Sequence, residues 1–120
     1  CISDPHIQFM SANSLNEDDV VVAISHSGTT SALVDTGRTV RSFNAPVIGL
    51  MPSGTPLSRE CDISLEVDVG DSARLNSPIT SRLAYMAIID VLAVGVAQLK
   101  PEAQDHLYNI IVSQSTLKIK

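Results

Sequence analysis

The sequence predicts an α/β protein in which short parallel strands alternate with helices. Three short apolar runs lack polar alternation, which is typical of strands covered on both faces; they span residues 20–25, 46–51 and 63–67. Segments with helical spacing, or with a capping residue before proline, lie between and around these runs. Because parallel strands require crossover connections, this alternation indicates a sheet layered against helices.

The first half of the chain is predicted to run helix, strand, helix. Asp4 followed by Pro5 is typical of an N-cap and the first helical position, and apolar residues continue at roughly helical spacing to Leu15. After a polar break comes the strand at 20–25. Helical spacing then predicts a helix over 29–43, which the turn-forming sequence Asn-Ala-Pro ends.

The second half continues with two strands and two helices. Strand 46–51 is followed by a loop, in which one helical turn is expected after Pro56, and then by strand 63–67. A long helix is predicted over 79–99 and a last helix over 101–115.

The long helix is too apolar for a helix that covers one side of a sheet. Between Leu83 and Ala97 only Tyr85, Asp90 and Gly95 interrupt the apolar residues, so we expect the helix to bury more than one face. It is either central to the domain or packed against a second subunit, and we favour the subunit. Asp90 is then expected at an interface or edge position with a hydrogen-bonded partner. The longest apolar run of the chain, Leu83 to Leu99, is interrupted by Asp90 and is short for a membrane span of about 20 residues.

Composition narrows the class of protein. A chain of 120 residues with 44% hydrophobic content is one domain that can bury a core. The formal net charge of −5 and the absence of a basic cluster argue against nucleic-acid binding by this chain. Cys1 and Cys61 lack metal-site spacing and are predicted to be free thiols. No signal peptide is visible, so we expect a cytoplasmic protein. No metal-ligand constellation is present either, and we expect neither a metal nor a cofactor.

The segment AISHSGTTSALV contains an unusual density of hydroxyl groups. Four hydroxyls and one glycine lie within six residues, namely Ser25, His26, Ser27, Gly28, Thr29 and Thr30. The segment leaves the carboxyl end of a predicted strand, where open parallel sheets bind ligands. Gly28 lets the backbone approach a ligand, and the amides that begin the next helix favour an anion. The site therefore suits the phosphate of a small polar molecule; the alternative is an ordinary capped turn.

The motif ISHSGTT resembles the Ser-x-Ser-Gly-x-Thr signature of SIS (sugar isomerase) phosphosugar-binding domains, which also follows a buried strand and opens a helix. Flanking segments resemble RpiR-type transcriptional regulators in particular. These segments are Asp4 to Gln8, Met10 to Ala12, Asp19 to Ser25, Thr80 to Leu83 and Ile88 to Leu92. The resemblance covers essentially the whole chain. It implies a three-layer α/β/α, flavodoxin-like fold with a parallel sheet, and a homodimer or higher homo-oligomer.

In the SIS family this loop holds the phosphate of a sugar phosphate. Carried over by position, the resemblance implies that Ser25, Ser27 and Thr30 bind the phosphate, that His26 lines the pocket and that Gly28 permits close approach. It also implies that residues 1–120 are a partial SIS domain, incomplete at the N-terminus. The first strand with its glycine-rich loop, and the DNA-binding helix-turn-helix domain of RpiR-type regulators, are expected to be absent.

We therefore expect the sugar-phosphate-sensing effector domain of an RpiR-type bacterial regulator of carbohydrate catabolism. A phosphosugar aldose–ketose isomerase is the alternative, with His26 or a carboxylate outside residues 1–120 as its base. A third possibility is a structural SIS remnant that only dimerises. No catalytic residue is assigned, because the sequence offers no Ser-His-Asp triad and the segment GTTSAL lacks the end of a P-loop.

Two further groups of residues are candidates for ligand contacts. Asn76 and Ser77 precede the long helix and are predicted to contact the ligand, although Ser77 before Pro78 also fits a plain N-cap. Asp68 and Asp71 follow the third strand, where they could line the pocket mouth and accept hydrogen bonds from sugar hydroxyls.

Overall fold

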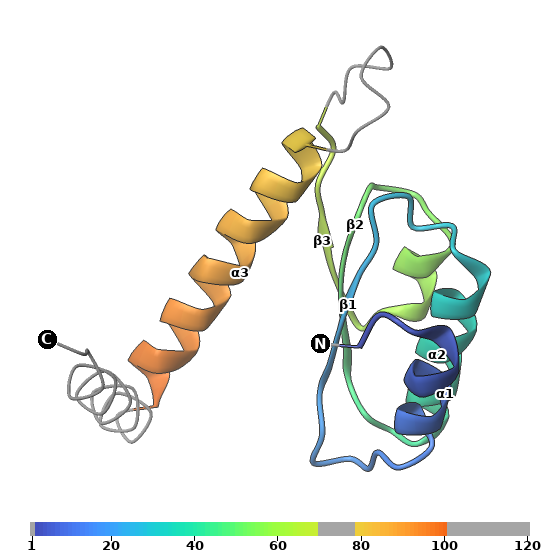
Figure 1. The fold of residues 1–120 in the computed structure, drawn as a ribbon. Coiled ribbons are helices and arrows are strands. Elements are labelled where there is room, and N and C mark those ends of the chain that lie inside the picture. Colours follow the sequence, from blue (N-terminus) through green and yellow to red (C-terminus); the bar gives the residue numbers. More distant parts are fainter. Residues whose placement is uncertain (1, 70–78, 101–120) are drawn as a thin grey trace, which may run out of the picture. The chain divides into compact units, whose positions relative to one another are not determined.

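The computed structural model describes residues 2–69 and 79–100 of the chain. The elements follow the predicted order (Figure 1). They are α1 (Pro5–Ala12), β1 (Val21–Ile24), α2 (Ser31–Ser42), β2 (Val47–Met51), the 3-10 helix η1 (Leu57–Glu60), β3 (Ile63–Glu66) and α3 (Ile79–Leu99). The helical turn expected after Pro56 is confirmed as η1. The helix predicted over 101–115 lies outside the described residues.

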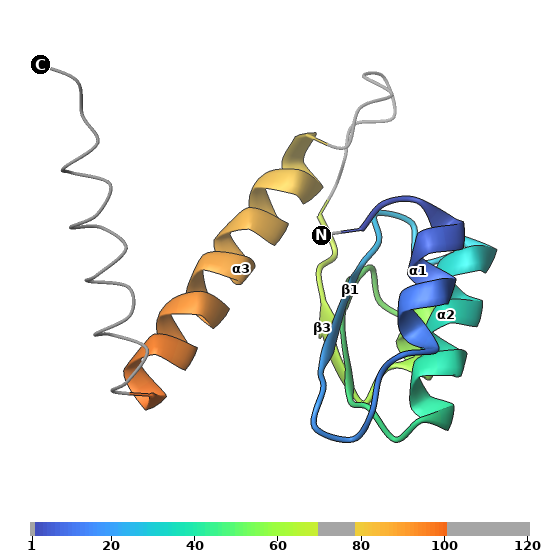
Figure 2. The ribbon, with the colours of Figure 1, turned by 60° about the horizontal axis from the view of Figure 1, so that its bottom comes forward.

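The three strands form a parallel sheet in the order β1-β2-β3. Ala23 pairs with Gly49, and Gly49 pairs with Ser64, so the carboxyl ends of all three strands meet at one edge. Helices α1 and α2 lie side by side on one face of this sheet (Figures 1 and 2). The parallel α/β class predicted from the sequence is confirmed.

A buried aliphatic cluster joins these two helices to the sheet. It comprises Ala12, Ala23, Val40, Ala45, Val47, Met51 and Leu57. Gly49 sits where the chain has no room for a side chain, because a Cβ there would lie 1.9 Å from Met51 Cε and 2.4 Å from Cys61 Sγ. The core therefore uses a glycine in β2 to admit the larger side chains beside it.

Side-chain and backbone caps account for the helix boundaries. The Asp4 carboxylate accepts hydrogen bonds from the backbone amides of His6 (2.9 Å) and Ile7 (3.0 Å), which confirms the predicted cap. At the end of α2, Asn44 takes a positive φ of 59°, a conformation that asparagine tolerates at a helix terminus. The start of α2 differs by two residues from the prediction, since Thr30 is its N-cap.

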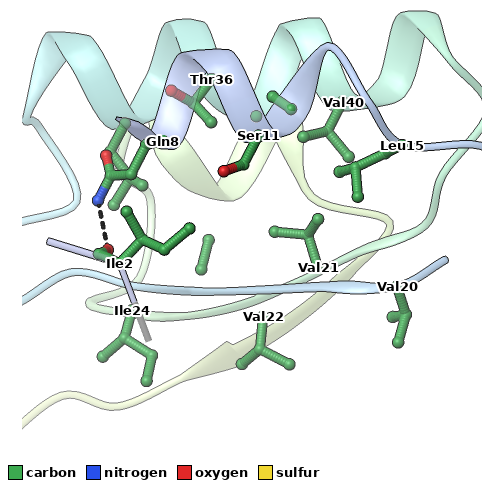
Figure 3. Close-up of a pocket in the computed structure, with 14 residues that line it drawn as sticks. Ile2, Gln8, Ser11, Leu15, Val20, Val21, Val22, Ile24, Thr36 and Val40 are labelled. Carbon is green, nitrogen blue, oxygen red and sulfur yellow. Dashed lines mark hydrogen bonds between the residues drawn. The ribbon is translucent and has the colours of Figure 1, made fainter. Parts of the chain in front are cut away.

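Part of the sheet carries apolar side chains that are exposed in the described chain, and the cover expected on this face stays a prediction. Val22 and Ile24 of β1 are 48% and 42% exposed, and Ile63 of β3 is 54% exposed. Figure 3 shows the side chains of Val22 and Ile24 on the face of β1 that points away from α1 and α2. A run of apolar residues identifies a strand suited to burial, but it contains no information about which layer covers each face.

The described part of the chain divides into two compact units, with the boundary between Tyr85 and Met86 inside α3. Ser81 and Tyr85 are buried, whereas Asp90 and most large apolar side chains of α3 are exposed. The burial of this helix against a second subunit, which we favoured from the sequence, stays a prediction. By length and composition α3 could cross a membrane, but one helix of this kind is weak evidence for a span.

Candidate functional site: a hydroxyl-rich loop at the carboxyl edge of the sheet

The segment 25–30 connects the carboxyl end of β1 to the first residue of α2. It lies at the predicted edge of the sheet, next to the loop that follows β2, because the Ser25 backbone amide donates to Leu50 O (2.9 Å) at the end of β2. The six residues predicted to bind a ligand here are contiguous, and four of them are exposed: His26, Ser27, Thr29 and Thr30.

Ser25 stabilises the conformation of this loop from the inside. Its side chain is buried, and its Oγ accepts a hydrogen bond from the Gly28 backbone amide (3.0 Å). Its backbone carbonyl accepts a hydrogen bond from the Tyr85 hydroxyl (3.2 Å). The loop folds back over Ser25 at Gly28, which has a left-handed φ of 62° that favours glycine. Two of the predicted residues thus shape the loop.

Ser27 forms a second, exposed hydrogen-bonding centre. Its Oγ accepts from the Thr29 backbone amide (3.3 Å) and from the Thr29 hydroxyl (3.0 Å). An oxygen that accepts twice keeps its own hydrogen as a donor. Ser27 can therefore donate to an anion from a position at the surface of the loop.

Thr30 stands at the N-cap of α2 but does not act as a side-chain cap. Its backbone is extended, with φ −63° and ψ 109°, and its hydroxyl makes no capping hydrogen bond. The positive end of the helix dipole is therefore not compensated by the cap side chain. This arrangement counts against the ordinary capped turn, which would use the cap hydroxyl to satisfy an amide of the first helical turn.

The loop after β2 also belongs to this region, although the sequence did not predict it there. The Thr55 side chain packs against Gly28, and the Leu57 backbone amide donates to Gly28 O (3.0 Å). The position of this loop in the sequence could have predicted its place. The residues PSGT follow β2, and they therefore lie at the same carboxyl edge of the sheet as the hydroxyl-rich loop that follows β1.

Asp68 lies at the same edge, after β3. Its Oδ1 accepts a hydrogen bond from the Ser53 backbone amide (2.9 Å), which ties the end of β3 to the loop after β2. Hydrogen bonds from the Ser53 side chain and backbone hold the pKa of Asp68 below its ordinary value. Because the folded state lowers this pKa, the contact stabilises the fold above the ordinary carboxyl range and is lost as the pH falls.

A separate hollow of about 420 Å³ lies between α1, α2 and β1 (Figure 3). Aliphatic side chains dominate its walls, including Val21, Leu33 and Val40, and Gln8 Nε2 donates to Ile2 O at its rim (2.9 Å). None of the residues of the hydroxyl-rich loop lines it. Its apolar walls do not suit a phosphate, so this hollow is not the predicted anion site.

The remaining predicted site residues have different outcomes. Asn76, Ser77 and Asp71 lie outside the described residues. His26 is exposed at the surface of the loop.

Among residues 2–69 and 79–100, no group of His, Cys, Asp or Glu side chains could hold a metal ion. Cys61 is a free thiol, and burial, followed by the Asp62 carboxylate, raises its pKa.

The profile of the SIS domain family matches residues 2–95. The chain belongs to the SIS domain family. This membership confirms the resemblance drawn from the motif ISHSGTT, and it agrees with the position of that motif between β1 and α2.

Relatives of this SIS domain include transcriptional regulators. It is 43% identical over 89 residues to the HTH-type transcriptional regulator HexR of Escherichia coli, covering 74% of this chain and 31% of that protein. It is 33% identical over 109 residues to HexR of Pseudomonas aeruginosa, covering 90% of this chain and 38% of that protein. The chain thus spans about a third of the length of these relatives.

A solved structure shares the fold over nearly the whole chain. The NanR protein of Vibrio vulnificus, complexed with ManNAc-6P, superposes with a TM-score of 0.87 at 22% identity, covering 99% of this chain and 46% of NanR. The similarity confirms the α/β fold of the SIS domain.

Proposed function

We propose that this SIS domain is the sugar-phosphate-sensing effector domain of an RpiR-type bacterial regulator of carbohydrate catabolism. The observation that carries the proposal is the loop 25–30. It presents the exposed hydroxyls of Ser27 and Thr30 at the start of α2, and the cap side chain leaves the helix dipole uncompensated. These are features of a site for a phosphate monoester held by neutral donors.

The relatives support a sensor. Two HexR proteins that resemble most of this chain are HTH-type transcriptional regulators, and the NanR structure that shares the fold was solved with the sugar phosphate ManNAc-6P. Within the proposal, Ser27 and Thr30 bind the phosphate together with the amides that begin α2. Ser25 and Gly28 shape the loop, while His26 and Thr29 line it. Asn76 and Ser77 supply contacts to the sugar.

The partners follow from this role. The chain carries a net charge of −5, so DNA contacts belong to a separate helix-turn-helix domain, and the regulator works in the cytoplasm. We assign the exposed apolar side chains of α3 to a homo-oligomer interface, which removes them from water. A sugar phosphate regulates DNA binding in such an assembly only if it binds one arrangement of the subunits more tightly than another.

Calorimetric titration with ManNAc-6P and a panel of other sugar phosphates and phosphorylated sugar acids tests the proposal. We expect saturable binding of at least one compound. Ser27→Ala removes a hydrogen bond to a charged group, which is worth about 1.5–3 kcal/mol, or roughly 10- to 150-fold in Kd. The matched control is Ser14→Ala, which removes an exposed hydroxyl that donates to Ser11 O outside the site.

Nuclear magnetic resonance of the same samples separates the sensor from the isomerase. Binding without chemical change of the sugar supports the sensor, whereas conversion between aldose and ketose would establish the isomerase. If no compound binds, or if both serine variants bind like the wild type, the loop is not the phosphate site.

A further inference from the structure

We propose that Thr55 is a positioning residue of the phosphate-binding loop, and that it acts by packing against Gly28. This inference rests on the proposed function, because its consequence is a change in sugar-phosphate affinity. The contact joins the loop after β2 to the loop after β1, and α2 and β2 separate these two loops in the sequence.

The geometry leaves no space between the two residues. A Cβ built on Gly28 would lie 2.3 Å from Thr55 Oγ1, 2.5 Å from Thr55 Cβ and 2.7 Å from Thr55 Cγ2. The Thr55 side chain therefore occupies the volume that any other residue at position 28 would need. The left-handed φ of 62° at Gly28 disfavours other residues for a second, independent reason.

Thr55 is itself held in place. Its hydroxyl donates to Pro52 O (3.1 Å), and its backbone carbonyl accepts from both the Ser58 amide (3.2 Å) and the Ser58 hydroxyl (2.8 Å). Leu57, two residues on, is fully buried in the core and donates its amide to Gly28 O (3.0 Å). The segment 55–58 is thus a fixed support against which the Gly28 backbone rests.

The position of Gly28 determines where the ligand-binding groups lie. Its amide donates to Ser25 Oγ, and Ser27 and Thr29 flank it on either side. A displacement at Gly28 would move the Ser27 hydroxyl and the amides that follow it relative to the start of α2. Binding sites lose affinity when their donors must be reordered at the moment of binding.

A double-mutant cycle tests the contact. Gly28→Ala, Thr55→Gly and the double variant are titrated with ManNAc-6P, or with whichever panel compound the wild type binds. We expect Gly28→Ala to weaken binding by roughly 10-fold or more, and the double variant to recover at least about threefold of that loss, as expected for side chains in direct contact. Thr55→Ser, which keeps Cβ and the hydroxyl, should bind within about threefold of the wild type.

Gly54→Ala is the matched control. Gly54 has nearly the same φ, 66°, but nothing lies within 4 Å of the place where its Cβ would be. The two glycine variants therefore share the backbone strain and differ in the contact with Thr55. We expect Gly54→Ala to change Kd by less than about threefold, while unfolding by urea confirms that each variant is folded under the titration conditions.

The outcomes separate this inference from the proposed function. If the wild type binds no sugar phosphate, the proposed function fails. If the wild type binds but the double variant is no better than Gly28→Ala, the positioning role of Thr55 is wrong and the proposed function stands.

Discussion

Single hydroxyl groups in the loop 25–30 have different roles, although their residue types are similar. Ser25 is buried and binds the Gly28 amide, whereas Ser27 is exposed and pairs with Thr29. Thr30 occupies the cap position without capping. The loop therefore contains one hydroxyl that maintains its shape and others at the surface that can meet a ligand.

Replacement of Ser25 should separate these roles. Ser25→Ala leaves the Gly28 amide without its buried partner, which costs about 1–3 kcal/mol in the free energy of unfolding. Ser27→Ala removes an exposed hydroxyl and should cost less than about 0.5 kcal/mol. Urea unfolding measures the free energy of unfolding of the two variants. If both lose the same free energy, Ser25 is not the residue that stabilises the loop conformation.

The elements of the fold are specified by local features, and α1 is a clear case. It has eight residues, too few to be stable in water alone, so its cap and its packing against α2 must hold it. The Asp4 carboxylate accepts from the two amides at its start. The exposed side chain of Asp4 thus contributes to the stability of the whole of α1.

Asp4→Ala should lower the free energy of unfolding by about 1 kcal/mol, because it removes an N-cap. The matched control is Asp18→Ala, which removes an equal charge from an exposed position outside the helices. Urea unfolding measures both variants. If the control is as destabilising as Asp4→Ala, the effect comes from charge and the capping role is wrong.

At the scale of the whole molecule, apolar surface is the dominant feature of α3. Val91 is 71% exposed and Leu99 is 85% exposed, which leaves large side chains in water within the described chain. Exposed apolar side chains in this number are typical of an interaction surface, and the proposed homo-oligomer places a second copy of the chain against them.

Val91→Glu should therefore weaken self-association. A charge placed in a buried interface costs about 2 kcal/mol or more, which is roughly a 30-fold increase in the dissociation constant. Gln98→Glu, at an exposed polar position of the same helix, is the control. Sedimentation equilibrium measures both. A monomeric wild type, or two variants that associate equally, would overturn the role of α3 in assembly.

The sequence by itself determined the elements of this protein and the place of its candidate site. Caps, apolar runs and helical spacing act over a few neighbouring residues, so β2, α3 and the start of α1 could be predicted within one residue. The end of α1 at Ala12 comes three residues before Leu15, to which helical spacing had extended the prediction. The hydroxyl-rich loop was predicted for the same reason, since its residues are contiguous. The SIS resemblance of the motif ISHSGTT added the expectation that the phosphate belongs to a sugar.

Only the tertiary structure decided which residues support the site and which surfaces stay open. Gly28 meets Thr55, and Ser25 meets the Tyr85 hydroxyl, across long separations in the chain. The exposed side chains of Val22 and Ile63 likewise depend on which layers cover the sheet. Such contacts depend on how distant elements pack together. A local sequence pattern shows which side chains are present, but it does not show which distant residues they will contact.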